Sequence, residues 1–207
     1  MRHLIAAALL AGATLAGPLA ASTAFAAETR TALFAGGCFW CIEADLEKVD
    51  GVGDVVSGYA GGEGESPTYE NHSKLGFREV VRVPYDPDVV SYERLVEIFF
   101  RSVDPTDDAG QFCDRGHSYT TAVYAGSAEE MATAGRVRER LAAEVRDPIV
   151  TQVLPAPDFT AAEDYHQDYA RKNPVRYKYY RTACRRDATV KAVWGDKAYT
   201  GIKESTS

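Results

Sequence analysis

Residues 36–43 read GGCFWCIE, a stretch whose residue types and spacing indicate thiol chemistry. Gly36 and Gly37 permit a tight turn, and the apolar spacing that follows predicts a helix beginning next to Cys38. Unpaired backbone N–H groups and the helix dipole at such a position stabilise a thiolate. We therefore expect Cys38 to have a lowered pKa and to act as a nucleophile at neutral pH.

The residues after Cys38 suggest two further roles. Phe39 and Trp40 are adjacent on the expected helix, so their side chains point about 100° apart and cannot both face one core. At least one of them is expected to line a pocket over Cys38. Cys41 forms a C-x-x-C pair with Cys38, the spacing of a dithiol redox pair.

Glu79 is a second candidate for chemistry. Residues 77–83 read FREVVRV, and strand periodicity places Phe77, Glu79, Val81 and Val83 on one face. A carboxyl that is partly buried on such a face stays protonated and can serve as an acid. The alternative is a Glu79 at the strand end that reaches solvent, and the pattern does not decide between the two.

The segment from Cys113 to Tyr119 gathers polar groups just before an expected strand. Cys113 and His117 are candidate metal ligands, but no second Cys or His pair follows at the spacing of a zinc site. We expect neither a metal nor a cofactor. His166 lies in an expected helix, where a histidine more often packs than catalyses.

The N-terminus has the pattern of a secretory signal peptide. A basic start at residues 1–3 precedes a short apolar stretch, and Ala24–Ala26 is an A-x-A cleavage pattern. We expect residues 1–26 to be removed and residues 27–207 to form a single domain, with no membrane span after cleavage. This predicts a periplasmic or secreted protein.

Charge and cysteine content narrow the classes of partner. The chain has a formal net charge of −7 and no basic stripe, so nucleic acid is not an expected partner. In an exported protein, Cys38, Cys41, Cys113 and Cys184 allow one or two structural disulfides, in three pairings. A chain of this length builds a core without such links, which leaves its thiols available for chemistry.

Strands and helices alternate along the chain. Strands are expected at residues 31–35, 54–59, 77–85, 119–124 and 149–154, and helices at residues 39–49, 91–100, 127–145 and 161–172. Ser91 is an expected helix cap, and Ser127 with Glu130 an expected capping box. Residues 173–207 show little periodicity and are expected to form an irregular surface tail. The pattern predicts one α+β domain with an antiparallel or mixed sheet.

Taken together, the motifs resemble the A-class peptide methionine sulfoxide reductases. GCFW at residues 37–40 is similar to the signature of that family. The chain also contains, in the family's order, SGYAGG at 57–62, PTY at 67–69, YDP at 85–87, DPT at 104–106, D-x-G-x-x-Y at 114–119 and AEDYHQ at 162–167. The resemblance covers roughly residues 32–174 and extends to a subgroup with CFWC, QFCDRG and a late cysteine. The ordered set is far more specific than any one motif.

The resemblance implies a fold and a reaction. The implied fold is a two-layer α/β sandwich with a ferredoxin-like β-α-β-β-α-β core. In the implied reaction the Cys38 thiolate attacks the sulfur of methionine-S-sulfoxide, free or in proteins, and becomes a sulfenic acid while Glu79 protonates or hydrogen-bonds the oxygen. The side chains implied to assist are Tyr69, Tyr119 and Asp114 near the oxygen, with Phe39 and Trp40 around the S-methyl group.

A second cysteine then condenses with the sulfenic acid, and a thioredoxin-like dithiol reduces the disulfide. Cys184 is the expected resolving thiol, because an irregular tail moves more easily than a helix and because the family commonly keeps its recycling cysteine in a late tail. Cys113 and Cys41 are its rivals. The family's usual resolving cysteine would fall near Lys178, which is not a cysteine. The sequence therefore leaves open which cysteine resolves the sulfenic acid.

The chain departs from the family pattern at two further places. Phe77 and Arg78 precede Glu79 where the family often has His-x, and Thr120 follows Tyr119 where Arg is usual. Two other functions also stay open. One is a periplasmic thiol-disulfide oxidoreductase using Cys38 and Cys41, and the other is a non-catalytic secreted domain with structural disulfides. A monomer that repairs oxidised exported proteins is expected.

Overall fold

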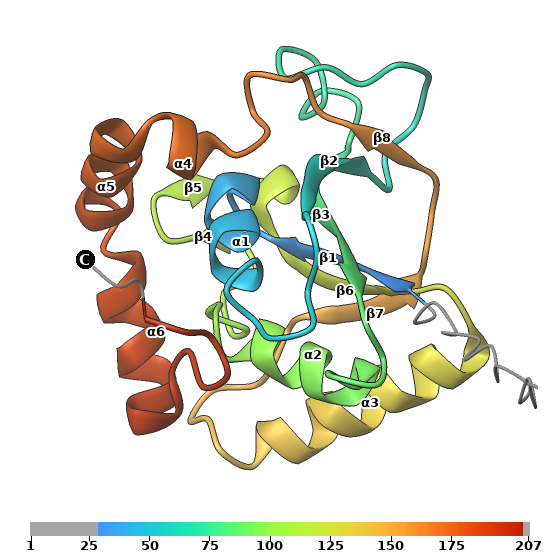
Figure 1. Ribbon diagram of the computed structural model, residues 1–207, viewed down its shortest axis with the longest axis vertical. Coiled ribbons are helices and arrows are strands. Elements are labelled where there is room, and N and C mark those ends of the chain that lie inside the picture. The colour runs from blue at the N-terminus through green and yellow to red at the C-terminus, as the bar shows by residue number, and fades with distance from the viewer. Residues whose placement is uncertain (1–28, 205–207) are drawn as a thin grey trace, which may run out of the picture.

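The computed structural model describes residues 29–204, and the predicted signal peptide of residues 1–26 lies outside that range. Figure 1 shows the arrangement of the elements. They are β1 (Arg30–Gly36), α1 (Phe39–Leu46), β2 (Val56–Ala60), β3 (Arg78–Tyr85), α2 (Tyr92–Phe100), β4 (Gly110–Gln111), β5 (Asp114–Arg115), η1 (His117–Tyr119), β6 (Thr121–Ala125), α3 (Ala128–Ala142), β7 (Gln152–Pro155), β8 (Phe159–Ala161), α4 (Tyr169–Lys172), α5 (Pro174–Ala183), α6 (Arg186–Trp194) and η2 (Gly195–Lys197).

The main sheet of the described chain has the strand order β7-β6-β1-β3-β2-β8. Its four central strands are antiparallel neighbours, and Phe34 of β1 lies opposite both Val81 of β3 and Val123 of β6. β8 adds to β2 in antiparallel fashion, whereas β7 runs parallel to β6. The run β1-α1-β2-β3-α2-β6 with strand order β6-β1-β3-β2 confirms the predicted ferredoxin-like core.

Helices α1, α2 and α3 form a second layer on one face of this sheet. Strand side chains alternate between faces, so Phe34, Val81 and Val123 point toward the same layer. There they join one apolar cluster with residues of the helices, including Ile42 and Phe99. A smaller cluster occupies the opposite face. The predicted two-layer sandwich is therefore present, and it places the start of α1 directly over the end of β1.

The expected caps at Ser91 and Ser127 are confirmed, but the capping box is only half formed, because Glu130 Oε2 accepts the N–H of Gly126 and not that of Ser127. Ser91 Oγ accepts the N–H of Arg94, and Ser127 Oγ accepts the N–H of Glu130. These two bonds satisfy N–H groups that have no partner within the helix. None of the helices in residues 29–204 is long and apolar enough to cross a membrane.

The helix predicted at residues 161–172 is wrong for most of its length. Strand β8 ends at Ala161, and only Tyr169–Lys172 are helical. Gln167 explains the difference, because its side-chain amide donates to the carbonyls of Ser57 and Ala162 and its oxygen accepts the N–H of Ser57. These contacts hold residues 162–168 in turns against strand β2.

The predicted irregular tail is also wrong, because residues 174–194 form the two helices α5 and α6, at one side of the sandwich in Figure 1. α5 has no buried residue, so it has no apolar stripe for a periodicity argument to detect. Its start agrees with local chemistry, since Pro174 occupies the first turn. What holds it in place is a set of side-chain contacts to the site described next.

Candidate active site

Cys38 stands between the end of β1 and the first turn of α1, as the N-cap residue of that helix. Gly36 and Gly37, which precede Cys38, allow the backbone to pass close to neighbouring side chains at this point. A side chain at Gly36 would lie 2.5 Å from Ile42 Cδ1, and one at Gly37, whose φ is +80°, would lie 2.6 Å from Gln111 Cβ. The prediction that Gly36 and Gly37 form a tight turn into a helix is confirmed.

A small cavity of about 60 Å³ opens beside Cys38. It brings together all the residues expected to act on the sulfoxide, but not the expected resolving thiol Cys184, and it adds one further tyrosine. Its lining residues are Cys38, Phe39, Trp40, Tyr69, Glu79, Asp114, Tyr119 and Tyr180. These residues come from α1, β3, β5, η1, α5 and a loop, so the sandwich and the C-terminal helices close the site together.

Glu79 is buried, with 2% of its surface exposed, which decides between the two placements that the sequence left open. Its Oε2 accepts the N–H of Phe39 at 2.9 Å, and His72 Nε2 lies 3.8 Å from Oε1. Burial raises the pKa of Glu79 to about 8, and burial also lowers the pKa of His72. At neutral pH the carboxyl therefore keeps its proton and can donate it.

The tyrosines beside Glu79 are also donors. Burial and then the nearby Glu79 raise the pKa of Tyr69 to about 12 and raise that of Tyr119 further. Both hydroxyls therefore keep their protons at neutral pH. Burial raises the pKa of Asp114, and the carboxylate of Asp114 accepts a hydrogen bond from the hydroxyl of Tyr180. The wall opposite Cys38 is thus built of groups that can hydrogen-bond an oxygen.

Phe39 and Trp40 both line the cavity. Trp40 is held on two sides, because its ring stacks on Tyr169 with centroids 3.7 Å apart and its Nε1 donates to His166 Nδ1 at 3.0 Å. Phe39 lies against the same histidine, at 5.0 Å between ring centroids. His166 packs, as expected, but what it packs against is the aromatic wall of the site, a role that its helical context did not indicate.

The pKa of Cys38, the first thiol of the C-x-x-C pair, differs from the expected one. Burial, and then the hydrogen bond with Cys41, raise the pKa of Cys38 well above its usual range. The pKa of Cys41 is lowered to about 7, first by the hydrogen bond from Cys38 and then by Arg186 and Arg181. The expectation of a lowered pKa at Cys38 is therefore wrong. The two thiols share one proton. The positively charged guanidinium groups of Arg186 and Arg181 lie on the side of Cys41.

Cys184 is not free, because it forms a disulfide with Cys113, with Cα atoms 5.0 Å apart. Cys38 and Cys41 are free. The structure thus differs from the arrangement in which Cys184 waits as a thiol for Cys38. The physical reason is that α5 is an ordered helix, and its end lies on the QFCDRG segment. Cys113, Asp114 and Cys184 bring ligand atoms within 4.8 Å of one another, but both sulfurs are in the disulfide.

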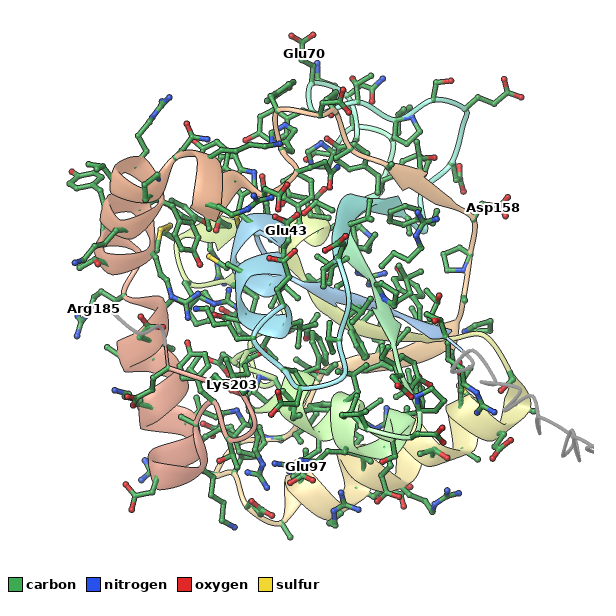
Figure 2. All side chains as sticks on the ribbon, in the orientation of Figure 1. Glu43, Glu70, Glu97, Asp158, Arg185 and Lys203 are labelled. Carbon is green, nitrogen blue, oxygen red and sulfur yellow. A yellow bond between two sulfur atoms is a disulfide. The ribbon has the colours of Figure 1, made fainter. Side chains whose placement is uncertain are left out.

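Tyr180 and Arg186 are site residues that the sequence did not indicate. Tyr180 reaches the cavity from α5 and lies in hydrogen-bond contact with Cys38 and Asp114. Arg186 is buried, with 1% exposed, whereas the neighbouring Arg185 points outward in Figure 2. No periodicity marked either residue. The only local signal was the number of tyrosines and arginines near a late cysteine.

Thr120, one of the departures from the family pattern, contacts Arg78, the neighbour of the other departure at Phe77. Arg78, which precedes Glu79, is buried and donates from Nε to Thr120 Oγ1 at 2.8 Å. Its other nitrogens donate to Tyr124 Oη and Gln152 Oε1. Arg78 and Thr120 therefore form one hydrogen-bonded unit next to Glu79 and Tyr119 of the site.

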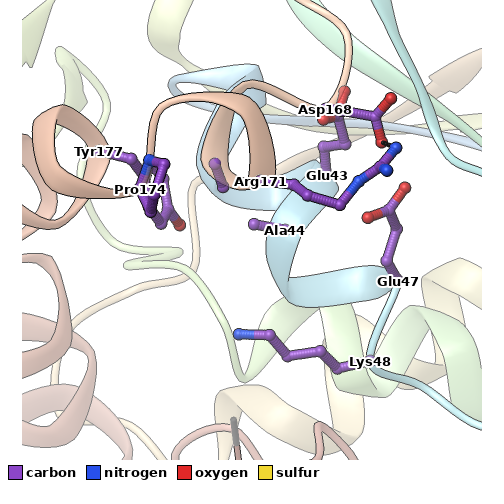
Figure 3. Close-up of a pocket in the computed structure, with 9 residues that line it drawn as sticks. Glu43, Ala44, Glu47, Lys48, Asp168, Arg171, Pro174 and Tyr177 are labelled. Atoms are coloured by element: carbon purple, nitrogen blue, oxygen red, sulfur yellow. Dashed lines mark ion pairs between the residues drawn. The ribbon is translucent and has the colours of Figure 1, made fainter. Parts of the chain in front are cut away.

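A larger cavity of about 430 Å³ lies on the outer side of α1 and is shown in Figure 3. Its charged residues include Glu43, Glu47, Asp168 and Arg171, and Arg171 pairs with Asp168 at 2.7 Å. The carboxyl of Glu43 accepts the hydroxyl of Ser57 at 2.6 Å. The lining holds no thiol, so this cavity is not the place for the thiol chemistry.

Comparison with known proteins agrees with this site. A family model described as peptide methionine sulfoxide reductase matches residues 30–198. A relative from Rhizobium meliloti (strain 1021), peptide methionine sulfoxide reductase MsrA 2, is 54% identical over 177 residues, which cover 86% of this chain and 89% of the relative.

Solved structures show the same similarity. Mxr1 from Saccharomyces cerevisiae in its reduced form aligns with a TM-score of 0.68 and 33% identity, over 72% of this chain and 87% of that chain. Methionine sulfoxide reductase A of Corynebacterium diphtheriae aligns with a TM-score of 0.65 and 31% identity, over 70% of this chain and 76% of that chain.

Proposed function

This chain belongs to the peptide methionine sulfoxide reductase family, and from that premise we propose that it reduces methionine-S-sulfoxide, free or in proteins, through a sulfenic acid on Cys38. It is an oxidoreductase of the A class of that family. One observation carries the proposal: a single cavity holds a thiol, a buried carboxyl that keeps its proton, and two aromatic walls.

The residues of the cavity divide the reaction between them. Phe39 and Trp40 offer an apolar surface to the S-methyl group, so the sulfoxide oxygen points to the polar wall. There Glu79 supplies a proton, and Tyr69 and Tyr119 supply hydrogen bonds to the oxygen as its negative charge develops. Asp114 holds Tyr180 beside this wall.

The nucleophile arises within the thiol pair. The Cys38 thiol is hydrogen-bonded to Cys41, and Cys41 accepts its proton as the Cys38 sulfur attacks the sulfoxide sulfur. An S–S bond forms between Cys38 and the substrate, and the protonated oxygen leaves the substrate sulfur as hydroxide. Hydroxide then adds to the Cys38 sulfur as the S–S bond breaks, which leaves Cys38 as a sulfenic acid. Methionine leaves as the reduced sulfide.

An intramolecular disulfide and an external dithiol then return the enzyme to its starting state. A thioredoxin-like protein suits this step, and Mxr1 of Saccharomyces cerevisiae has been solved in complex with Trx2. The pattern of residues 1–26 supports a periplasmic or secreted location, where the enzyme repairs oxidised exported proteins.

The test is reduction of the separated S and R epimers of methionine sulfoxide with dithiothreitol. We expect turnover of the S epimer alone, and no turnover in the Cys38→Ser variant, because a serine hydroxyl does not replace a thiolate nucleophile. Turnover of the R epimer, or activity retained in Cys38→Ser, contradicts the proposal. Exchange of protein disulfides without sulfoxide reduction indicates a thiol-disulfide oxidoreductase instead.

A further inference from the structure

Cys38 and Cys41 occupy the two positions of a helix start whose side chains face each other. Cys38 is the N-cap residue of α1, and its φ of −50° and ψ of 117° place it outside the helix. Cys41 is the third residue of the helix, and its N–H lies 3.1 Å from the carbonyl oxygen of Cys38. In capping boxes, the side chain at each of these two positions reaches the backbone of the other, so the two side chains lie on the same side of the first turn.

The two thiols therefore lie close enough to affect each other's pKa. A side-chain hydrogen bond joins the thiols, and both side chains are buried. A disulfide needs Cα atoms within about 7 Å, and the N-cap conformation lets Cys38 turn its side chain without unwinding α1. The stiffness of the helix is thus no obstacle, because only one of the two cysteines belongs to it.

The guanidinium groups of Arg186 and Arg181 lie near Cys41. Arg186 is fixed by a hydrogen bond from Nη2 to the carbonyl of Ser102 at 2.9 Å, and Arg181 by an ion pair to Asp45 at 2.9 Å. Both lower the pKa of Cys41, after the larger effect of the hydrogen bond from Cys38. A thiol with a pKa near the ambient pH is the best attacking group in disulfide chemistry, and one of low pKa also leaves readily.

We propose that Cys41 is the resolving thiol, whose sulfur condenses with the Cys38 sulfenic acid to form a Cys38–Cys41 disulfide. This inference rests on the proposed function and names the residue that completes it. Cys113 and Cys184 are bonded to each other and have no thiol to offer. Their disulfide stays closed throughout the cycle and ties α5 to the site.

The step balances. The Cys41 thiolate attacks the Cys38 sulfur, an S–S bond forms and the S–O bond of the sulfenic acid breaks. The hydroxide that leaves combines with the proton that Cys41 gives up, and forms water. An external dithiol then attacks the Cys38 sulfur, which faces the cavity, and Cys41 departs as the stabilised thiolate. Both cysteines end as free thiols, and the dithiol as a disulfide.

The direct test uses the native protein without any reductant. One equivalent of methionine-S-sulfoxide is added, free thiols are alkylated, and the disulfides are mapped by mass spectrometry. We expect a new Cys38–Cys41 disulfide beside an unchanged Cys113–Cys184 disulfide. A bond from Cys38 to Cys113 or Cys184 overturns the proposal, and so does a Cys38 sulfenic acid that persists and reacts with dimedone.

A variant series gives the second readout. Cys41→Ser lacks the proton acceptor of Cys38, so it should release one methionine per enzyme more slowly, and it should then keep a dimedone-reactive Cys38 and lose repeated turnover with thioredoxin. The matched control, with both Cys113→Ser and Cys184→Ser, should continue to cycle. Repeated turnover by Cys41→Ser overturns the assignment. If the native protein releases no methionine, the proposed function itself falls, whereas release without a Cys38–Cys41 bond overturns only this assignment.

Discussion

Two parts of the molecule meet at Cys38, and they are built in different ways. The sheet-borne part consists of β1, α1 and β3, and five of the seven residues of β1 are buried. The C-terminal part consists of α5 and α6, and none of the ten residues of α5 is buried. Nevertheless α5 supplies Tyr180 to the same cavity to which β3 supplies Glu79.

The difference shows that a site can be assembled by two kinds of force. Burial of apolar side chains positions the sheet-borne part, and that force is spread over many residues. In the C-terminal part, α6 also buries Val190 and Trp194 in that core, whereas α5 buries no residue. What positions α5 is a few links: the Cys113–Cys184 disulfide, the Tyr180–Asp114 hydrogen bond and the Arg181–Asp45 ion pair. Single substitutions should therefore act differently in the two parts.

The largest effect is expected from Arg186→Met. Arg186 is buried, donates to the carbonyl of Ser102 at 2.9 Å and lies over the ring of Phe112. Its removal leaves a buried acceptor and part of the charge of Asp45 without a partner, so we expect a loss of about 3–5 kcal/mol in the free energy of unfolding. Denaturant unfolding measures this loss. The matched control is Arg185→Met, at an exposed position, which should change the free energy of unfolding by less than about 0.5 kcal/mol.

An equal stability of the two arginine variants would contradict this prediction, since it would mean that α6 is held by Val190 and Trp194 alone.

Loss of the disulfide comes next. Cys184→Ser opens a link between residues 71 positions apart, and we expect the free energy of unfolding to fall by about 2–4 kcal/mol. Cys113→Ser removes the same bond and should have the same effect, and the double variant should be no worse than either. Calorimetry of the oxidised proteins checks this, and a change near zero would show that the polar contacts of α5 suffice.

In the sheet-borne part, Glu79→Gln should lower the rate of the chemical step. The amide keeps the burial but has no proton to give, so we expect the single-turnover rate to fall about 10²-fold or more. In the native enzyme the rate should also fall as pH rises through about 8, because Glu79 then loses its proton. Glu70→Gln, on an exposed loop labelled in Figure 2, is the matched control.

Rapid quench at a series of pH values measures both effects. The Gln variant should lack the fall near pH 8, and an identical pH profile in native and variant protein would assign the acid to another group.

The smallest effect is expected from Tyr180→Phe. The ring stays in place, but Asp114 loses the hydroxyl that donates to it. One hydrogen bond contributes about 1 kcal/mol, so we expect a roughly fivefold lower single-turnover rate. Tyr179→Phe, whose side chain is 77% exposed, should leave the rate unchanged. Equal rates for the two variants would mean that α5 only covers the site.

The parts of the fold that follow local rules could be predicted from the sequence. Alternation in residues 77–83 indicated β3, and Ser91 and Ser127 marked the starts of α2 and α3 correctly. Local rules failed at residues 161–172, where Gln167 bonds to Ser57, 110 residues away. They also failed at α5, which follows no apolar periodicity because it buries no residue.

The sequence by itself determined five of the six strands of the main sheet, the position of Cys38 at a helix start and the motif residues that surround it, because alternation and helix capping depend on near neighbours. Only the tertiary structure decided which cysteines are bonded and how the thiols titrate. Those properties depend on burial and on charges such as Arg186, 145 residues after Cys41 in the chain, which no local pattern encodes.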